Sequence, residues 1–275
     1  KDPKNPHTVV NPIGEVNVLT LPDYRVPWWV TDEPLAEGSL ETYNISGYNV
    51  TIYIPPGFNE SREYPVLYFQ VGNSYLKYAD MKKVLDNLIS HNYIPPAIAV
   101  FVEPKNPNCE FAASPDYITF FNKDLVGWVK EHYKVGKSYL VGNSLGALIL
   151  LYIMINRTDL YDGAVLQSGL FLPADQLKEL CDEANWTIVD IYDLLNSTDL
   201  RGKRFYVQAG FLEELPGYTV LTWSTAIKEK LKDAGAEVKF DTAPQGHTWI
   251  FWRDYMGYAL KYVCLLYTSD AADDG

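Results

Sequence analysis

Between residues 63 and 263, short apolar runs alternate with segments whose apolar residues recur at helical spacing. The apolar runs lack the alternation of a half-exposed strand, which indicates strands buried on both faces, and they span residues 66–71, 97–102, 138–141, 164–167 and 204–208. The helical segments span residues 78–91, 117–133, 145–155, 219–234 and 250–263. Strands and helices in this order form a mostly parallel central sheet with helices on both faces, so the expected fold class is α/β.

The remaining segments complete a single domain of residues 1–263. Residues 49–54 and 237–241 predict two further strands, and a Pro-, Asn- and Gly-rich N-terminal extension, residues 1–47, gives only a weak strand signal at residues 15–19. The connection over residues 171–203 is longer than an ordinary loop and carries large apolar residues. We interpret it as a short cap-like insertion, because ligands of such sheets bind at the carboxyl ends of the strands.

Both ends of the sequence look altered. The chain begins at Lys1, not Met, so we expect an incomplete N-terminus. A signal peptide, a basic segment followed by an apolar one, is not visible, and we leave the compartment open.

Residues 264–273 can be back-translated into the end of a common transposon-type sequencing adaptor. We interpret residues 264–275 as a non-native tail derived from such an adaptor, and the alternative is a genuine acidic tail.

Charge and cysteine content exclude several classes of protein. The net charge of −12 argues against a nucleic-acid partner, which needs a basic face. The sequence contains no run of 18 apolar residues, so no membrane span is expected. The three cysteines have no metal-ligand spacing and do not suggest a disulfide framework, so we expect Cys109 and Cys181 to be inert. Neither a metal nor an organic cofactor is implied, and the oligomeric state stays open.

The segment Gly142-Asn143-Ser144-Leu145-Gly146 follows a predicted strand and opens a predicted helix. This context is typical of a nucleophile elbow, in which a sharp turn exposes a serine hydroxyl above the sheet. The small residues on either side let the turn close, and the helix N-terminus supplies free N–H groups for an oxyanion. We therefore predict that Ser144 is a nucleophile rather than a serine that only caps a helix.

A serine hydroxyl is a weak nucleophile and needs a base, which in this fold follows the last strand. Of the four histidines, only His247 lies there, and we predict that it is the base. The acid is expected after the strand at residues 204–208, where two adjacent glutamates occur. Glu213 is the first choice and Glu214 the reserve; a solvated loop carboxylate is the alternative.

Beyond the elbow, the chain resembles a family of α/β-hydrolase esterases that contains esterase D, enterochelin esterase-like trilactone hydrolases, feruloyl esterases and mycolyltransferases. The resemblance covers residues 49–263 and is closest to the enterochelin esterase-like branch. It rests on the elbow and on Tyr64-Pro65-Val66-Leu67-Tyr68, Asp86-Asn87-Leu88-Ile89 with Ile94-Pro95-Pro96, Gln167-Ser168-Gly169, Ala209-Gly210 with Glu213, and Gly246-His247 with Trp249 and Trp252-Arg253.

This resemblance implies the α/β-hydrolase fold and a serine carboxylic ester hydrolase that works through an acyl-enzyme. Ser144 attacks the ester, His247 moves the proton and Glu213 orients His247. The backbone N–H groups of Leu145 and Asn73 are the expected oxyanion hole. The segment before Asn73 departs from the family, which usually has His-Gly or Asp-Gly where this chain has Val71-Gly72.

The expected substrates are small-molecule or carbohydrate-linked esters, namely esters of sugars, phenolic acids or siderophore-like lactones. Three aromatic residues are predicted to bind them: Phe171, Trp186 and Trp249. Where the closest branch often has an Arg before a Glu, this chain has Pro104-Lys105-Asn106 and then Glu110, which argues against a highly charged siderophore. Two alternatives stay open: an acyltransferase of the mycolyltransferase type with the same triad, and a non-catalytic binding protein on this fold.

Overall fold

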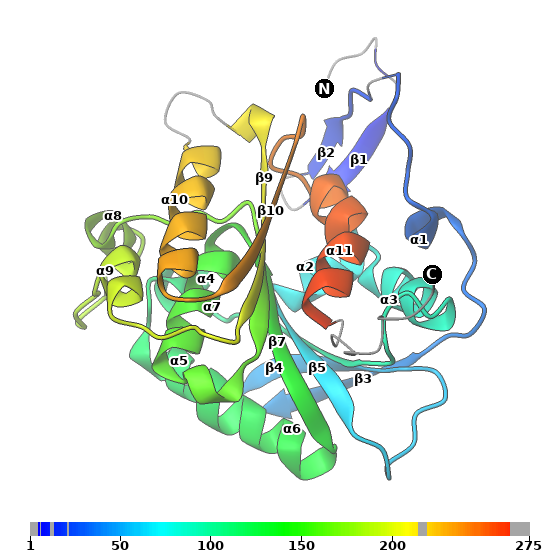
Figure 1. Cartoon of the computed structure of the whole chain (residues 1–275), viewed down its shortest axis with the longest axis horizontal. Coiled ribbons are helices and arrows are strands. Elements are labelled where there is room, and N and C mark those ends of the chain that lie inside the picture. Colours follow the sequence, from blue (N-terminus) through cyan, green and yellow to red (C-terminus); the bar gives the residue numbers. More distant parts are fainter. Residues whose placement is uncertain (1–4, 6, 12–13, 21, 214–218, 265–275) are drawn as a thin grey trace, which may run out of the picture.

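The computed structural model describes residues 5, 7–11, 14–20, 22–213 and 219–264. Eight strands form one sheet in the order β10-β9-β8-β7-β5-β6-β4-β3, and helices lie on both sides of it (Figure 1). The strands are β3 (Ser39–Ile45), β4 (Tyr48–Ile54), β5 (Tyr64–Gln70), β6 (Ile98–Val102), β7 (Val135–Asn143), β8 (Gly163–Gln167), β9 (Arg204–Gly210) and β10 (Glu237–Ala243). The expected α/β-hydrolase architecture is confirmed.

Six neighbouring strands, from β10 to β6 in the order of the sheet, are parallel. β4 pairs antiparallel with β6, and β3 pairs antiparallel with β4. The carboxyl ends of the parallel strands therefore meet at one edge of the sheet. There, Asn143 at the end of β7 lies opposite Gln167 of β8, which lies opposite Gln208 of β9.

Two apolar layers separate the helices from the sheet. One layer holds the apolar sides of α4 to α10, and the other holds those of α1, α2, α3 and α11. The helices are α1 (Trp28–Thr31), α2 (Gly72–Tyr78), α3 (Met81–Ser90), α4 (Pro107–Phe111), α5 (Pro115–Thr119), α6 (Val126–His132), α7 (Ser144–Asn156), α8 (Ala174–Glu179), α9 (Ile191–Asn196), α10 (Val220–Asp233) and α11 (Trp249–Cys264).

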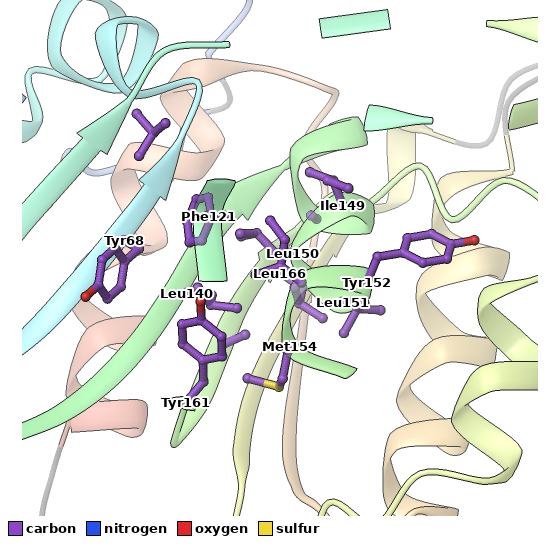
Figure 2. Packing of buried hydrophobic residues seen from close by; sticks show 14 of the residues in the cluster. Tyr68, Phe121, Leu140, Ile149, Leu150, Leu151, Tyr152, Met154, Tyr161 and Leu166 are labelled. Carbon is purple, nitrogen blue, oxygen red and sulfur yellow. The ribbon is translucent and has the colours of Figure 1, made fainter. Parts of the chain in front are cut away.

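Helix α7, which begins at the predicted elbow, is apolar on all sides because other elements cover it on all sides. Leu148, Ile149 and Leu150 have no exposed surface. Figure 2 shows side chains of α7 packed beside Leu140 of β7 and Leu166 of β8. The helix is thus fixed in the core, and so is the turn that precedes it.

Two predicted helices differ from the structure in their continuity. The segment predicted at residues 78–91 contains the end of α2 and all of α3, and the break falls at Asp80, whose φ is 45°. The segment predicted at residues 117–133 is continuous, but it is π-helical over Phe120–Leu125, between α5 and α6. Apolar spacing detects the buried stripe and does not distinguish these variants.

The N-terminal extension contains more structure than its composition indicates. The strands β1 (Thr8–Asn11) and β2 (Gly14–Asn17) form a hairpin, and β3 extends the main sheet. Trp29 of α1 is buried against α11, where its ring makes an edge contact with Tyr258 at 4.9 Å between centroids. A Cβ on Gly257 would lie 2.8 Å from the Trp29 ring, so the glycine makes this close packing possible.

The expectation that Cys109 and Cys181 are inert is wrong. They form a disulfide between α4 and the segment after α8, across a sequence separation of 72. Nearby, the indole N–H of Trp186 donates to the carbonyl of Ala112 at 3.0 Å. The segment at residues 171–203, interpreted from sequence as a cap, is thus fastened to the chain before α5. Cysteine spacing could not reveal this pairing, because only the folded chain brings the two residues together.

The described part of the chain contains no helix long and apolar enough to cross a membrane. At the C-terminal end, Cys264 is the last residue of α11 and is buried. The rest of the segment interpreted as adaptor-derived, residues 265–275, lies outside the described residues.

We expect the disulfide to stabilise the fold by about 2–4 kcal/mol, because a cross-link that closes a long loop restricts the unfolded chain. Reductant should therefore lower the urea midpoint of the wild-type protein. The matched control is the double variant Cys109→Ser/Cys181→Ser, whose midpoint should be low with or without reductant. An unchanged wild-type midpoint, with both thiols shown free by mass spectrometry, would contradict this prediction.

Candidate active site

Ser144 lies in a strained turn at the carboxyl end of β7. It has a φ of 53°, in the left-handed region that residues with a side chain rarely adopt, and it is the first residue of α7. A Cβ on Gly142 would lie 2.7 Å from Leu150 and 2.9 Å from the backbone of Gly146. The flanking glycines thus allow the helix to approach the strand closely, and Ser144 stays half-buried at the end of the sheet. This geometry is that of a nucleophile elbow.

His247 and Glu213 contact each other across the neighbouring strand ends. Glu213 follows β9 and His247 follows β10, and Glu213 Oε1 lies 3.0 Å from His247 Nδ1. The Glu213 side chain has no exposed surface, whereas that of His247 is 31% exposed. The second carboxylate oxygen, Oε2, accepts the N–H of Gly210 at 2.7 Å. Glu213 is therefore held on both oxygens, and as an acceptor it fixes the proton of His247 on Nδ1.

Asp241, a carboxylate on β10, accepts the hydroxyl of Tyr206, so its side chain is engaged away from the His247 contact. Glu214, the reserve choice for the acid, lies outside the described residues. Within the described residues, Glu213 is the carboxylate that contacts His247.

Ser144 and His247 follow strands that end at the same edge of the sheet, but the described residues show no hydrogen bond between them. β8 and β9 lie between the strands that precede them. The carbonyl of Ser144 accepts the N–H of Leu170 at 3.1 Å. Within the described residues, no hydrogen bond joins the Ser144 hydroxyl to His247. Catalytic hydrogen bonds are often long without substrate and tighten when it binds, so the missing bond does not conflict with a serine–histidine pair.

The backbone N–H groups of the two predicted oxyanion donors differ in whether they already have an acceptor. Leu145 is the second residue of α7, where N–H groups have no acceptor within the helix. The N–H of Asn73 instead donates to Glu103 Oε2 at 3.1 Å, so it is already engaged. Glu103 follows β6, and burial raises the pKa of its carboxyl group even though the Asn73 N–H opposes that rise. A polar residue directly after a buried strand was the sequence signal for Glu103, but without a motif it could not be singled out.

The predicted substrate-binding aromatics are only partly available. Phe171 has no exposed surface and packs in the core, so its assignment as a substrate-binding residue is wrong. Its ring fills the space beside Gly169, where a Cβ would lie 2.2 Å from it. Trp186 is half-buried and donates to Ala112, as described above. Trp249 is half-buried and makes an edge contact with Tyr75 at 5.1 Å.

A cavity of about 720 Å³ lies behind the His247 loop. It is bounded by the N-terminal hairpin, by Tyr24 and by the start of α11, and its lining includes Gly246, Thr248 and Trp249. Ser144 is not among the lining residues.

Within the described part of the chain, no group of three or more His, Cys, Asp or Glu side chains is arranged to hold a metal ion.

Two buried amides, to which sequence reasoning assigned no role, lie near the carboxyl ends of β8 and β9. Gln167 and Gln208 have no exposed surface. Gln167 Nε2 donates to Gln208 Oε1 at 2.7 Å and to the carbonyl of Trp252 at 2.8 Å, while its Oε1 accepts the hydroxyl of Tyr75 at 2.9 Å. Each glutamine lies at the end of a predicted apolar strand, and a polar residue in that position was the signal that could have indicated them.

The family model described as "Putative esterase" matches residues 46–262. That match spans most of the chain, and the chain belongs to this esterase family. It is therefore an ester hydrolase by family and an α/β-hydrolase by fold. No curated protein sequence matches the chain.

Similar solved structures agree with the fold. The enterobactin esterase of Shigella flexneri, in the presence of enterobactin, is 18% identical with a TM-score of 0.75, covering 94% of this chain and 68% of that one. The ferric enterobactin esterase of Salmonella typhimurium is 18% identical with a TM-score of 0.74, covering 95% and 67%. The feruloyl esterase module of Clostridium thermocellum, complexed with sinapinate, is 16% identical with a TM-score of 0.66, covering 90% and 96%.

The raised pKa of Glu103 predicts a pH-dependent cost to folding. The folded protein binds a proton at Glu103 more readily than the unfolded chain does, so stability falls as pH rises above the ordinary pKa of a glutamate. Glu103→Gln keeps an acceptor for Asn73 and removes the charge. We expect its melting temperature to exceed that of the wild type at pH 8 and the difference to shrink towards pH 4. Glu60→Gln, at an exposed glutamate, is the control, and parallel profiles for Glu103→Gln and wild type would contradict the prediction.

Proposed function

We propose that this esterase is a serine carboxylesterase with Ser144 as nucleophile, His247 as base and Glu213 as acid. The observation that carries the proposal is the 3.0 Å contact between Glu213 and His247, at the edge of the sheet where the strained Ser144 turn lies. A base oriented by a buried carboxylate, at the same edge as a serine hydroxyl, is the arrangement that activates a serine.

The proposed reaction proceeds in two half-reactions. His247 takes the hydroxyl proton as Ser144 Oγ attacks the ester carbonyl, and the resulting imidazolium is stabilised by Glu213. The tetrahedral intermediate then collapses, the alcohol leaves with the proton from His247, and an acyl-serine remains. His247 then takes a proton from water as the water attacks the acyl group, and it returns that proton to Ser144 Oγ when the second tetrahedral intermediate collapses and the carboxylic acid leaves.

The oxyanion of each tetrahedral intermediate needs hydrogen-bond donors close to Ser144. The N–H of Leu145 is the first donor in this proposal, and the N–H of Asn73 is the second. Because the Asn73 N–H is bonded to Glu103, that contact must open before Asn73 can serve. Donors aimed at the developing charge contribute much of the rate enhancement in enzymes of this kind.

Phenolic esters and lactones are the proposed substrate class. Support comes from the similar folds of enterobactin and feruloyl esterases, and from the half-buried Trp249, which follows His247 by two residues. A screen over p-nitrophenyl acetate, methyl ferulate, acetylated xylan and enterobactin tests the class. Added alcohol acceptors then separate the hydrolase from an acyltransferase with the same triad, because a transferase passes the acyl group to the alcohol in place of water.

Replacing the nucleophile tests the core of the proposal. Ser144→Ala should lower kcat by about 10⁶-fold, the loss measured when a serine hydrolase loses its nucleophile. The folded state should survive, as judged by circular dichroism, and an organophosphonate should label Ser144 in the wild type only. Turnover within tenfold of the wild type would place the nucleophile elsewhere.

A pair of carboxamide variants tests the acid. Glu213→Gln should lower kcat by about 10²–10⁴-fold, because His247 loses the partner that selects its tautomer and stabilises its charged form. The matched control is Asp241→Asn, which should stay close to wild type because Asp241 is engaged with Tyr206. A crippled Asp241→Asn with a normal Glu213→Gln would reverse the assignment and leave Ser144 and His247 untouched.

A further inference from the structure

The contact with Glu213 restrains His247 at one ring nitrogen, Nδ1. Nε2, the atom that must face the serine in the proposed mechanism, is not the atom held by this bond. The imidazole side chain is 31% exposed, so part of the ring is not packed against protein. A second contact on the ring restrains its plane further.

Trp252 makes that second contact. The rings of His247 and Trp252 are perpendicular, with an interplanar angle of 88° and centroids 4.9 Å apart, which is a favourable edge-to-face geometry. Trp252 is only 4% exposed, so this face of His247 is closed to solvent. Trp249 in turn packs edge-on against the Trp252 ring, with ring centroids 4.8 Å apart.

Trp252 is itself held at three points. Its indole N–H donates to the hydroxyl of Ser168 at 2.9 Å. Its carbonyl accepts Gln167 Nε2 at 2.8 Å, and its backbone N–H donates to the carbonyl of Thr248 at 3.2 Å. A tryptophan fixed at both its backbone and its indole nitrogen has one orientation, so it can impose one on the ring that it contacts.

Ser168 lies at the carboxyl end of β8, one of the two strands between those that precede Ser144 and His247. It directly follows β8, has no exposed surface and has a φ of 47°. Its N–H donates to the carbonyl of Gln208 at 2.7 Å, which holds the strained backbone in place. A residue with a side chain costs free energy in this conformation and persists only where its surroundings enforce it. Two residues further on, Leu170 donates to the carbonyl of Ser144, so the Ser168 turn is tied to the elbow as well.

We propose that Ser168 and Trp252 form a clamp that sets the plane of the His247 ring relative to Ser144. The inference rests on the proposed function, since it assigns positioning residues to the base of that mechanism. In the Ser168–Trp252 clamp, Ser168 acts through Trp252, and Trp252 acts through His247. Neither residue exchanges a proton with substrate.

The first experiment measures kcat and KM for Ser168→Ala, Trp252→Phe and the double variant. Both single variants remove the same hydrogen bond, so each should lower kcat by about 10–100-fold with KM unchanged, as expected for a misplaced catalytic group. The double variant should be no slower than Trp252→Phe, because the two changes are not independent. Ser168→Ala removes one oxygen atom, so it reports on the clamp even if Trp252→Phe does not fold.

The chain offers a matched control. Trp128 in α6 stacks on His132 with ring centroids 3.8 Å apart, and neither residue of this tryptophan–histidine pair belongs to the candidate site. Trp128→Phe should leave kcat and KM at the wild-type values. Loss of kcat in this control would mean that removing any indole next to a histidine is harmful, and it would overturn the specific role of Trp252.

The second experiment reads His247 directly and needs no turnover. The chain has four histidines, so ¹⁵N-histidine labelling gives few signals, and His247→Gln identifies the Nδ1-bound proton that faces Glu213. Ser168→Ala should shift or broaden the His247 signal and leave the His132 signal unchanged. Trp128→Phe should shift or broaden the His132 signal and leave the His247 signal unchanged. Unchanged His247 signals in both Ser168→Ala and Trp252→Phe would overturn the clamp. An altered His247 signal in these variants together with an unchanged kcat would overturn it as well. If the wild type hydrolyses no ester and an organophosphonate leaves Ser144 unlabelled, the proposed function fails, while the His247 signals still decide the clamp.

Discussion

One buried amide connects the three parts of the chain on which the candidate site depends. Gln167 accepts from Tyr75 of α2, donates to Gln208 of β9 and donates to the carbonyl of Trp252 in α11. The first element, α2, contains Asn73, the second proposed oxyanion donor. The second element, β9, precedes Glu213, and the third, α11, follows His247. Leaving one of these buried groups without a partner would lower the stability of the fold by about 1–3 kcal/mol. The packing that satisfies all three bonds is therefore favoured over packings that break one of them. A polar group with no exposed surface therefore specifies one arrangement of elements that apolar contacts alone would leave adjustable.

The sequence predicted those parts of the fold and site that depend on local pattern. Continuous apolar runs located the parallel strands, and the glycines around Ser144 located the elbow because only a strained turn requires them. The chain order of the fold then indicated His247 and Glu213, which do contact each other. Distant pairings left no such pattern. Cys109 and Cys181 are 72 positions apart, and the role of Trp252 depends on Ser168, so neither could be deduced from neighbouring residues.

Phe171 shows why aromatic composition is a poor guide to binding. The segment at residues 171–203 carries more apolar side chains than a solvated loop needs, and its sequence suggested a surface offered to substrate. The structure uses them as core: Phe171, Leu177 and Ile191 are fully buried beside α7. The hydroxyl of Tyr192 donates to the carbonyl of Phe171, and that of Tyr152 donates to the carbonyl of Val189. The disulfide adds a covalent restraint, so this insertion is an integral layer of the domain in which most large apolar side chains face inward.

The contact between Glu103 and Asn73 gives the proposed mechanism an electrostatic constraint of its own. An oxyanion that develops near Asn73 would lie close to the Glu103 carboxyl group, and two negative charges at such a distance repel each other. Burial already disfavours the charged form of Glu103, which is the direction that reduces this repulsion. The Asn73 N–H has the opposite effect, because its bond stabilises the carboxylate. In the proposed mechanism, turning that N–H to the oxyanion would remove from Glu103 an interaction that favours its charged form, and proton uptake by Glu103 would become easier. Release of the donor and loss of the negative charge would thus be linked at Glu103.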